Sequence, residues 1–181
     1  VEDVQLLSLV PHISQAVRDQ AVANGGFSGS TMTLCVFQDG YMRCMHVGDS
    51  RIYRLRDGQL ERITQDHSLV EELVRAGLIT SEQARTHPRR NVITRALGTE
   101  GENEPDLLVS DVQKGDLFLL CSDGLNSMID DEAIGLTLKE CSMERAADSL
   151  IEQALAAGGR DNVTVLLCSF QGKGVFPWSR D

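Results

Sequence analysis

The sequence contains no pair of cysteines in a Cys-x-x-Cys arrangement, the spacing that often marks a zinc site. Its five cysteines stand far apart along the chain, so we expect reduced and mostly buried thiols, as in a reducing cytoplasm. No apolar run approaches the roughly 20 residues of a membrane-spanning helix, and residues 1–9 lack the basic start and cleavage site of a signal peptide. These absences predict a cytoplasmic location and no membrane segment.

Basic residues are scarce as well. The chain has 17 lysines and arginines against 27 aspartates and glutamates, a formal net charge of −10. This charge disfavours a nucleic acid or an anionic membrane surface as a partner. An acidic protein can still bind anionic substrates if its carboxylates hold divalent cations, because a bound metal dominates the local field. With 181 residues, we expect a single domain with one substantial core, and a monomer.

Apolar periodicity predicts a long helix over residues 4–23, with Pro11 as a kink or boundary. Short alternating strands joined by Asp-Gly and Gly-Asp turns then predict an antiparallel meander, followed later by a hairpin around Lys114-Gly115. The predicted strands are residues 31–37, 41–47, 51–55, 59–64, 107–109, 116–121 and 162–170. Helices are expected over residues 130–138 and 142–157. Because regular βαβ alternation is lacking, this order favours an α+β fold with helices on the outer faces of stacked sheets.

Two short helices are expected between the meander and the hairpin. Ser68 and Thr80 each stand three residues before a glutamate or glutamine, the order of a capping box at a helix start. Residues 87–98 are polar, basic and interrupted by proline. We therefore expect a loop-rich insertion at the surface.

Three aspartates stand at the ends of predicted strands beside small residues. Asp49 and Asp123 follow apolar strands, and Asp161 precedes the last strand. If these strand ends converge, three carboxylates meet in one acidic pocket, which suits hard cations such as Mg²⁺ and Mn²⁺.

The alternative is turn chemistry, because aspartate beside glycine stabilises turns through its side chain. Asp39-Gly40 and Asp57-Gly58 are best explained in this way. Asp49, Asp123 and Asp161 differ because their neighbours are apolar strands, where an unpaired carboxylate is costly. Composition and spacing leave both interpretations open. His46 lies within an alternating strand, and we expect it to be a buried structural histidine.

Five ordered blocks together resemble bacterial members of the protein phosphatase 2C family. The blocks are Val-Gly-Asp-Ser-Arg at 47–51, Thr-Gln-Asp-His-Ser at 64–68, Asn-Val-Ile-Thr-Arg-Ala-Leu-Gly at 91–98, Leu-Leu-Cys-Ser-Asp-Gly-Leu at 119–125 and Gly-Gly-Arg-Asp-Asn-Val-Thr at 158–164. The resemblance extends over residues 30–170. Five blocks in one order are far more specific than any single motif.

The resemblance implies two stacked antiparallel sheets flanked by helices, an αββα sandwich with a flap at about residues 68–97. It also implies a centre of two Mn²⁺ or Mg²⁺ ions, with Asp123 and Asp161 as metal ligands and catalytic residues. Asp49 is similar to the aspartate that holds a third ion together with the residue matching Asp123. Asn162 is expected to orient Asp161 without touching the metal.

The implied activity is hydrolysis of phosphoserine and phosphothreonine monoesters in proteins, with a metal-activated water as the nucleophile. Substrates of bacterial Ser/Thr kinases are the expected partners. The sequence lacks the family's opening segment, which carries further metal ligands, so residues 1–170 are expected to be an N-terminally incomplete phosphatase domain followed by a tail at 171–181. The alternative function is a catalytically impaired regulatory or phosphoprotein-binding module.

Overall fold

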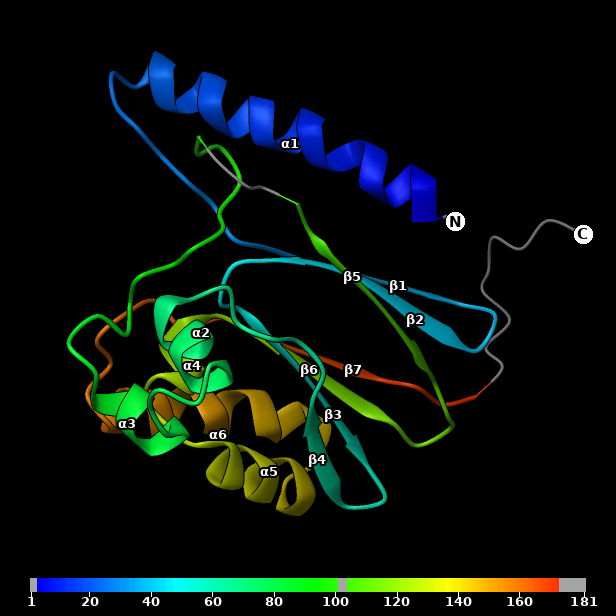
Figure 1. The fold of residues 1–181 in the computed structure, drawn as a ribbon. Coiled ribbons are helices and arrows are strands. Elements are labelled where there is room, and N and C mark those ends of the chain that lie inside the picture. Colours follow the sequence, from blue (N-terminus) through cyan, green and yellow to red (C-terminus); the bar gives the residue numbers. More distant parts are fainter. Residues whose placement is uncertain (1–2, 101–103, 173–181) are drawn as a thin grey trace, which may run out of the picture.

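The computed structural model describes residues 3–100 and 104–172, so the predicted tail at 171–181 lies almost wholly outside the described residues. Helices and strands follow one another without βαβ alternation (Figure 1). The helices are α1 (Asp3–Ala23), α2 (Leu69–Arg75), α3 (Ser81–Thr86), α4 (Asp123–Asn126), α5 (Asp131–Glu140) and α6 (Met143–Ala156). The strands are β1 (Met32–Gln38), β2 (Tyr41–Val47), β3 (Arg51–Arg56), β4 (Gln59–Arg62), β5 (Asp106–Asp111), β6 (Leu117–Cys121) and β7 (Val165–Ser169).

The strands form two antiparallel sheets. One has the order β1-β2-β5, and the other has the order β4-β3-β6-β7. In the first sheet Cys35 is opposite Cys44, and in the second Arg51 is opposite Cys121. The second register places the end of β6, where Asp123 follows, beside the start of β3.

The pairing corrects two sequence predictions. The four strands between residues 32 and 62 form no continuous meander, because β1 and β2 belong to one sheet and β3 and β4 to the other. β5 and β6 form no hairpin either, since β5 pairs with β2 and β6 pairs with β3. At both places the chain passes from one sheet to the other. Local turn chemistry does not determine which strand a neighbour pairs with.

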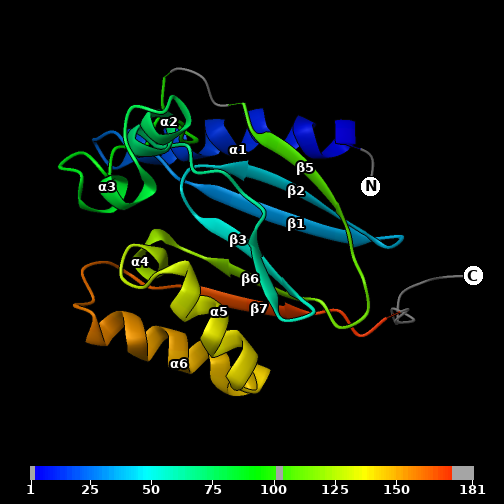
Figure 2. The same ribbon diagram turned by 60° about the horizontal axis from the view of Figure 1, so that its bottom comes forward.

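Helices cover the outer faces of both sheets, as expected from the sequence (Figure 2). Helix α1 packs on the three-stranded sheet through Leu6 and Val10, which contact Met45 and Val47 of β2. Helices α5 and α6 pack on the four-stranded sheet. Their buried cluster includes Tyr53, Leu119, Cys121, Leu125, Ile134, Leu138, Ala146, Leu150 and Ala154. The αββα sandwich is therefore confirmed.

Helix α1 continues through Pro11, which ends no helix here. Among the described residues, no helix is both long and apolar enough to cross a bilayer.

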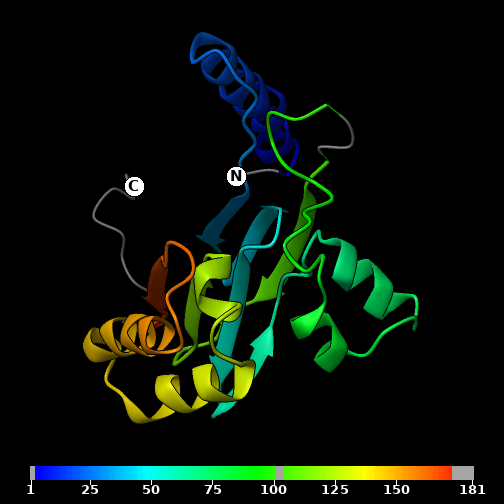
Figure 3. The same cartoon turned by 90° about the vertical axis from the view of Figure 1, so that its left-hand side faces the viewer.

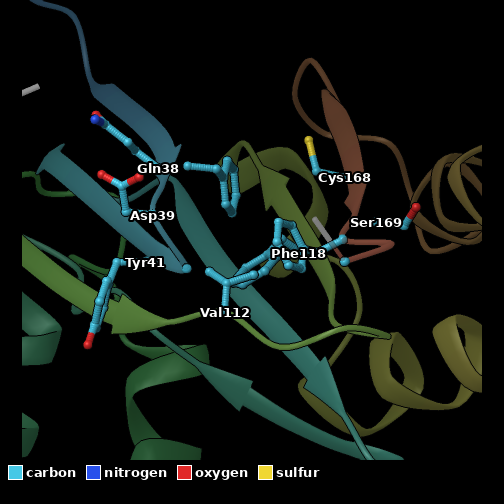
Figure 4. Close-up of a pocket in the computed structure, with 11 residues that line it drawn as sticks. Gln38, Asp39, Tyr41, Val112, Phe118, Cys168 and Ser169 are labelled. Carbon is cyan, nitrogen blue, oxygen red and sulfur yellow. The ribbon is translucent and has the colours of Figure 1, made fainter. Parts of the chain in front are cut away.

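The two sheets pack on each other through Met42, Cys44, Ile52 and Phe118. At one end of this interface lies a cavity of about 880 Å³, with Phe37, Val112, Phe118 and Phe170 in its lining. Figure 4 shows Val112 and Phe118 close together between the sheets, and Cys168 projecting from β7. Asp49, Asp123 and Asp161 do not line this cavity.

The short helices α2 and α3 stand beside the sheets, on the opposite side of the molecule from β7 (Figure 3). Both begin as predicted. Ser68 Oγ accepts from Glu71 N, and Thr80 forms a complete capping box with Gln83. The segment that contains them is closed at its base by an antiparallel bridge between Ser68 and Ile93.

Candidate metal and phosphoester site

Asp49 lies in the tight connection between β2 and β3. Gly48 before it has φ +112°, and a β carbon at this position would overlap the side chain of Thr31. Only glycine fits both constraints without strain. On the other side of Asp49, Ser50 Oγ lies 3.1 Å from Thr31 Oγ1. Asp49 thus lies between a glycine that packs closely on Thr31 and a serine whose hydroxyl is within hydrogen-bond distance of Thr31 Oγ1.

Asp123 is the first residue of α4, directly after β6. Ser122 joins this strand end to the start of β7, because its Oγ donates to Asn162 O at 3.1 Å and accepts from Thr164 N at 2.9 Å. Gly124 completes the contact, since a β carbon there would overlap the carbonyl oxygen of Asn162. The Ser-Asp-Gly sequence therefore lets the loop that carries Asp161 approach the end of β6 closely.

Asp161 lies in the loop between α6 and β7. The loop leaves α6 through Gly158 and Gly159, whose φ angles are +129° and +50°. Asp161 Oδ1 accepts from the backbone N of Asn162 at 2.7 Å. This contact joins Asn162 to Asp161, but through the backbone of Asn162. The expected role of the Asn162 side chain stays a prediction.

A cleft of about 720 Å³ contains Asp49, Asp66 and Asp123 in its lining. Its lining also includes residues of α2, of α3 and of the loop after them, among them Arg85 and Arg90. Asp161 lines a separate hollow beside Ile151 and Leu155 of α6. The structure thus brings Asp49 and Asp123 to one cleft, with Asp161 next to it.

The site carries a surplus of negative charge. Burial, followed by the charges of Asp123 and Asp66, raises the pKa of Asp49 to about 6. Burial, followed by the charge of Asp161, also raises the pKa of Asp123. Within the described ranges, no lysine or arginine forms an ion pair with Asp49, Asp123 or Asp161. A divalent cation would relieve this repulsion.

Sequence reasoning gave no role to Asp66, although it lies within the block at 64–68. Its side chain is 9% exposed and accepts from Arg51 Nη2 at 2.7 Å. Asp66 therefore faces the same cleft as Asp49, but with its charge balanced by a guanidinium. The pairing partner, Arg51, also belongs to one of the five blocks, at 47–51.

No group of three or more histidine, cysteine, aspartate or glutamate side chains in residues 3–100 and 104–172 is arranged to hold a metal ion. Metal coordination by Asp49, Asp123 and Asp161 thus stays a prediction. Their chemistry fits hard cations, which prefer carboxylate oxygens and retain several waters. The expected structural role of His46 is confirmed, because its ring is fully buried and lies 3.1 Å from Gln65 O.

Two relatives have sequences similar to this chain over most of its length. It is 46% identical over 139 residues to the serine/threonine protein phosphatase PstP of Mycobacterium tuberculosis. The aligned region covers 77% of this chain and 27% of PstP. The chain is 44% identical over 140 residues to the serine/threonine phosphatase stp of Listeria welshimeri, covering 77% and 56%. The chain thus spans from about a quarter to just over half the length of these relatives.

Solved structures of phosphatases are also similar to this chain. A serine/threonine phosphatase of S. agalactiae has a TM-score of 0.83 at 34% identity, covering 91% of this chain and 69% of that one. The catalytic domain of PstP in complex with two manganese ions has a TM-score of 0.76 at 39% identity, covering 85% and 65%. A sequence profile described as protein phosphatase 2C matches residues 10–162. The chain therefore belongs to the protein phosphatase 2C family.

Proposed function

We propose that this chain is a large part of the catalytic domain of a metal-dependent protein serine/threonine phosphatase. The observation that carries the proposal is the pair Asp49 and Asp123, which face one cleft with raised pKa values and no ion-pair partner in the described residues. The relatives named above are serine/threonine phosphatases, which supports the same activity.

Asp123 and Asp161 would hold a central pair of Mn²⁺ or Mg²⁺ ions, and Asp49 and Asp123 would hold a third. When bound, these ions would supply Lewis acidity that activates water and neutralises charge on the phosphoryl oxygens. The PstP structure in complex with two manganese ions supports Mn²⁺ as the metal. Asn162 would fix the orientation of Asp161, with which it is already hydrogen-bonded through its backbone.

The remaining residues of the cleft would bind the phosphorylated segment of a protein. Arg85 and Arg90 line the same cleft as Asp49 and Asp123. Neither forms an ion pair within the described ranges, so both are available to a phosphate group. The segment at 68–97 would act as the flap of residues 1–170, which form the phosphatase domain. The substrates would be proteins phosphorylated by bacterial Ser/Thr kinases in the cytoplasm, and the enzyme would be a monomer.

The proposal is tested by hydrolysis of p-nitrophenyl phosphate and of phosphoserine and phosphothreonine peptides. The assay uses the full natural polypeptide, including any residues that precede Val1, with and without Mn²⁺. We expect turnover that requires the metal and that falls at least about a hundredfold in Asp161→Asn. Metal-independent turnover, or none, would contradict the proposal. Tight phosphopeptide binding without hydrolysis would instead favour a regulatory module.

A further inference from the structure

His67 is buried at a junction of three chain segments, and all its polar groups have partners. Its side chain is 6% exposed. Its backbone N donates to Gly48 O at 2.8 Å, and its backbone O accepts from Thr94 N at 2.8 Å. Its ring Nδ1 accepts from Gly48 N at 3.1 Å. On the other side of the ring, Nε2 lies 3.2 Å from a carboxylate oxygen of Asp106 at the start of β5.

These contacts specify one form of the imidazole. Because the Gly48 amide is a donor, Nδ1 must be an unprotonated acceptor. The ring proton is therefore on Nε2, where it is donated to Asp106. Arg95 Nη1 lies 3.3 Å from Nε2 but only 2.9 Å from Asp106, to which it donates. The two ring nitrogens thus have different roles, since Nδ1 holds the loop of Asp49 and Nε2 anchors the ring to β5.

The same residue closes the base of the segment at 68–97. Next to His67, Ser68 forms a bridge with Ile93, and Leu69 N donates to Val92 O at 2.9 Å. The base of the segment and the loop of Asp49 therefore share one anchor. A neighbouring buried histidine, His46, lies against the ring with the centroids 4.9 Å apart, but its hydrogen bonds go to Thr33 and Gln65.

We propose that His67 is a positioning residue for the metal site, which fixes Asp49 through the Gly48 amide and links its position to the base of the 68–97 segment. Gly48 has φ +112°, and a glycine can change its backbone conformation easily once the hydrogen bond from its amide is lost. Asp49 follows directly, and a metal ligand must keep a narrow geometry to bind tightly. The inference rests on the proposed metal-dependent function and adds a regulatory link to it.

Two amide variants separate the roles of the two ring nitrogens. In His67→Asn, the side-chain oxygen occupies a place similar to Nδ1 and can still accept from Gly48 N. In His67→Gln, the amide nitrogen reaches the place of Nε2 and can still donate to Asp106, but the acceptor for Gly48 is lost. His46→Gln is the matched control, since it replaces a second buried histidine that has no hydrogen bond to Gly48.

Mn²⁺ affinity is measured by calorimetry on the full natural polypeptide, together with hydrogen exchange of the Gly48 amide. We expect His67→Gln to weaken the weaker class of Mn²⁺ sites by about tenfold and to speed Gly48 exchange. His67→Asn should change the affinity by less than about threefold, and His46→Gln should leave it at the wild-type value although its melting temperature falls. Equal Mn²⁺ affinities in the two His67 variants would overturn the proposal.

A histidine with only a structural role would lower stability in all three variants without this pattern. Neither Mn²⁺ affinity nor hydrogen exchange requires turnover. A lack of phosphatase activity would therefore overturn the proposed function, but the measurements on His67 could still be interpreted. If His67→Gln does not fold, the wild-type protein provides the test. Long-range ¹H–¹⁵N correlation spectra should show His67 neutral with the proton on Nε2, and a proton on Nδ1 would overturn the proposal.

Discussion

Arg51 donates to both carboxylate oxygens of Asp66, with Nε 2.9 Å from Oδ1 and Nη2 2.7 Å from Oδ2. The two side chains are 15% and 9% exposed. This fork is the geometry in which a guanidinium binds a carboxylate most strongly. It separates the acids of the cleft into two kinds, since Asp66 has a permanent cationic partner whereas Asp49 and Asp123 have none among the described residues.

Arg51→Gln should destabilise the protein by about 3 kcal/mol, because it leaves the carboxylate of Asp66 buried without its partner. The measurement is urea unfolding at neutral pH. Arg43→Gln is the control: its ion pair with Asp3 is more exposed, at 28% and 48%, and its loss should cost less than about 1 kcal/mol. Equal losses in the two variants would contradict the assignment of a strong Arg51–Asp66 pair.

Asp49→Asn should stabilise the metal-free protein at neutral pH. The pKa of Asp49 is raised to about 6, above its value of about 3.9 in the unfolded chain, so the folded state binds the proton more tightly. Stability from this group is therefore highest below about pH 4 and falls as the pH rises to about 6. After allowance for solvent screening, the cost at neutral pH is about 1 kcal/mol.

Thermal or urea unfolding of wild type and Asp49→Asn, between about pH 4 and pH 7.5, measures this difference. The two proteins should be equally stable at the acidic end and should diverge as the pH rises. Saturating Mn²⁺ should reverse the order, because a ligand that binds only the folded state stabilises it. A constant difference across the pH range would contradict a raised pKa at Asp49.

Gly124→Ala should destabilise the protein by about 2 kcal/mol or more, because the new β carbon would overlap the carbonyl of Asn162. The displaced loop carries Asp161, so Mn²⁺ affinity should fall as well. Gly135→Ala is the control within α5. Its β carbon would meet Leu60 at 3.4 Å, and alanine in a helix should raise stability by up to about 1 kcal/mol. Denaturant unfolding compares the two variants.

Asp123→Asn should weaken Mn²⁺ binding by at least about tenfold, because an amide lacks the charge of the carboxylate that would hold the ions. Asp39→Asn is the matched control. Asp39 has φ +53° in a turn, a conformation that asparagine also tolerates, and its substitution should leave the affinity for Mn²⁺ unchanged. Calorimetric titration of both variants decides the point, and unaltered binding in Asp123→Asn would remove this residue from the metal site.

Features that depend on neighbouring residues could be predicted from the sequence. The helix starts at Ser68 and Thr80 follow from side chains that bond to the backbone three residues on. The alternation of β2 and the periodicity of α6 gave correct elements within a few residues. The placement of Asp49 and Asp123 at strand ends could also be predicted locally, since one short segment contains both the strand and the residue that follows it.

Features that join distant segments could not be predicted in this way. The Gly48-Asp49-Ser50 turn looks like a hairpin turn, but the chain changes sheets there because β3 pairs with β6, which comes much later in the chain. The roles of Asp66 and His67 were missed for the same reason. Their partners Arg51, Gly48 and Asp106 are adjacent only in the folded chain, and no local pattern records such contacts.

The cavity between the sheets, about 880 Å³ in volume, has a consequence for the response to hydrostatic pressure. Unfolding fills internal voids with water and so reduces the volume of the system. Where the space near Phe37 and Phe170 is closed to water, it should therefore favour loosening of this end as pressure rises. Compression thus acts on an end of the sandwich whose cavity is not lined by Asp49, Asp123 or Asp161.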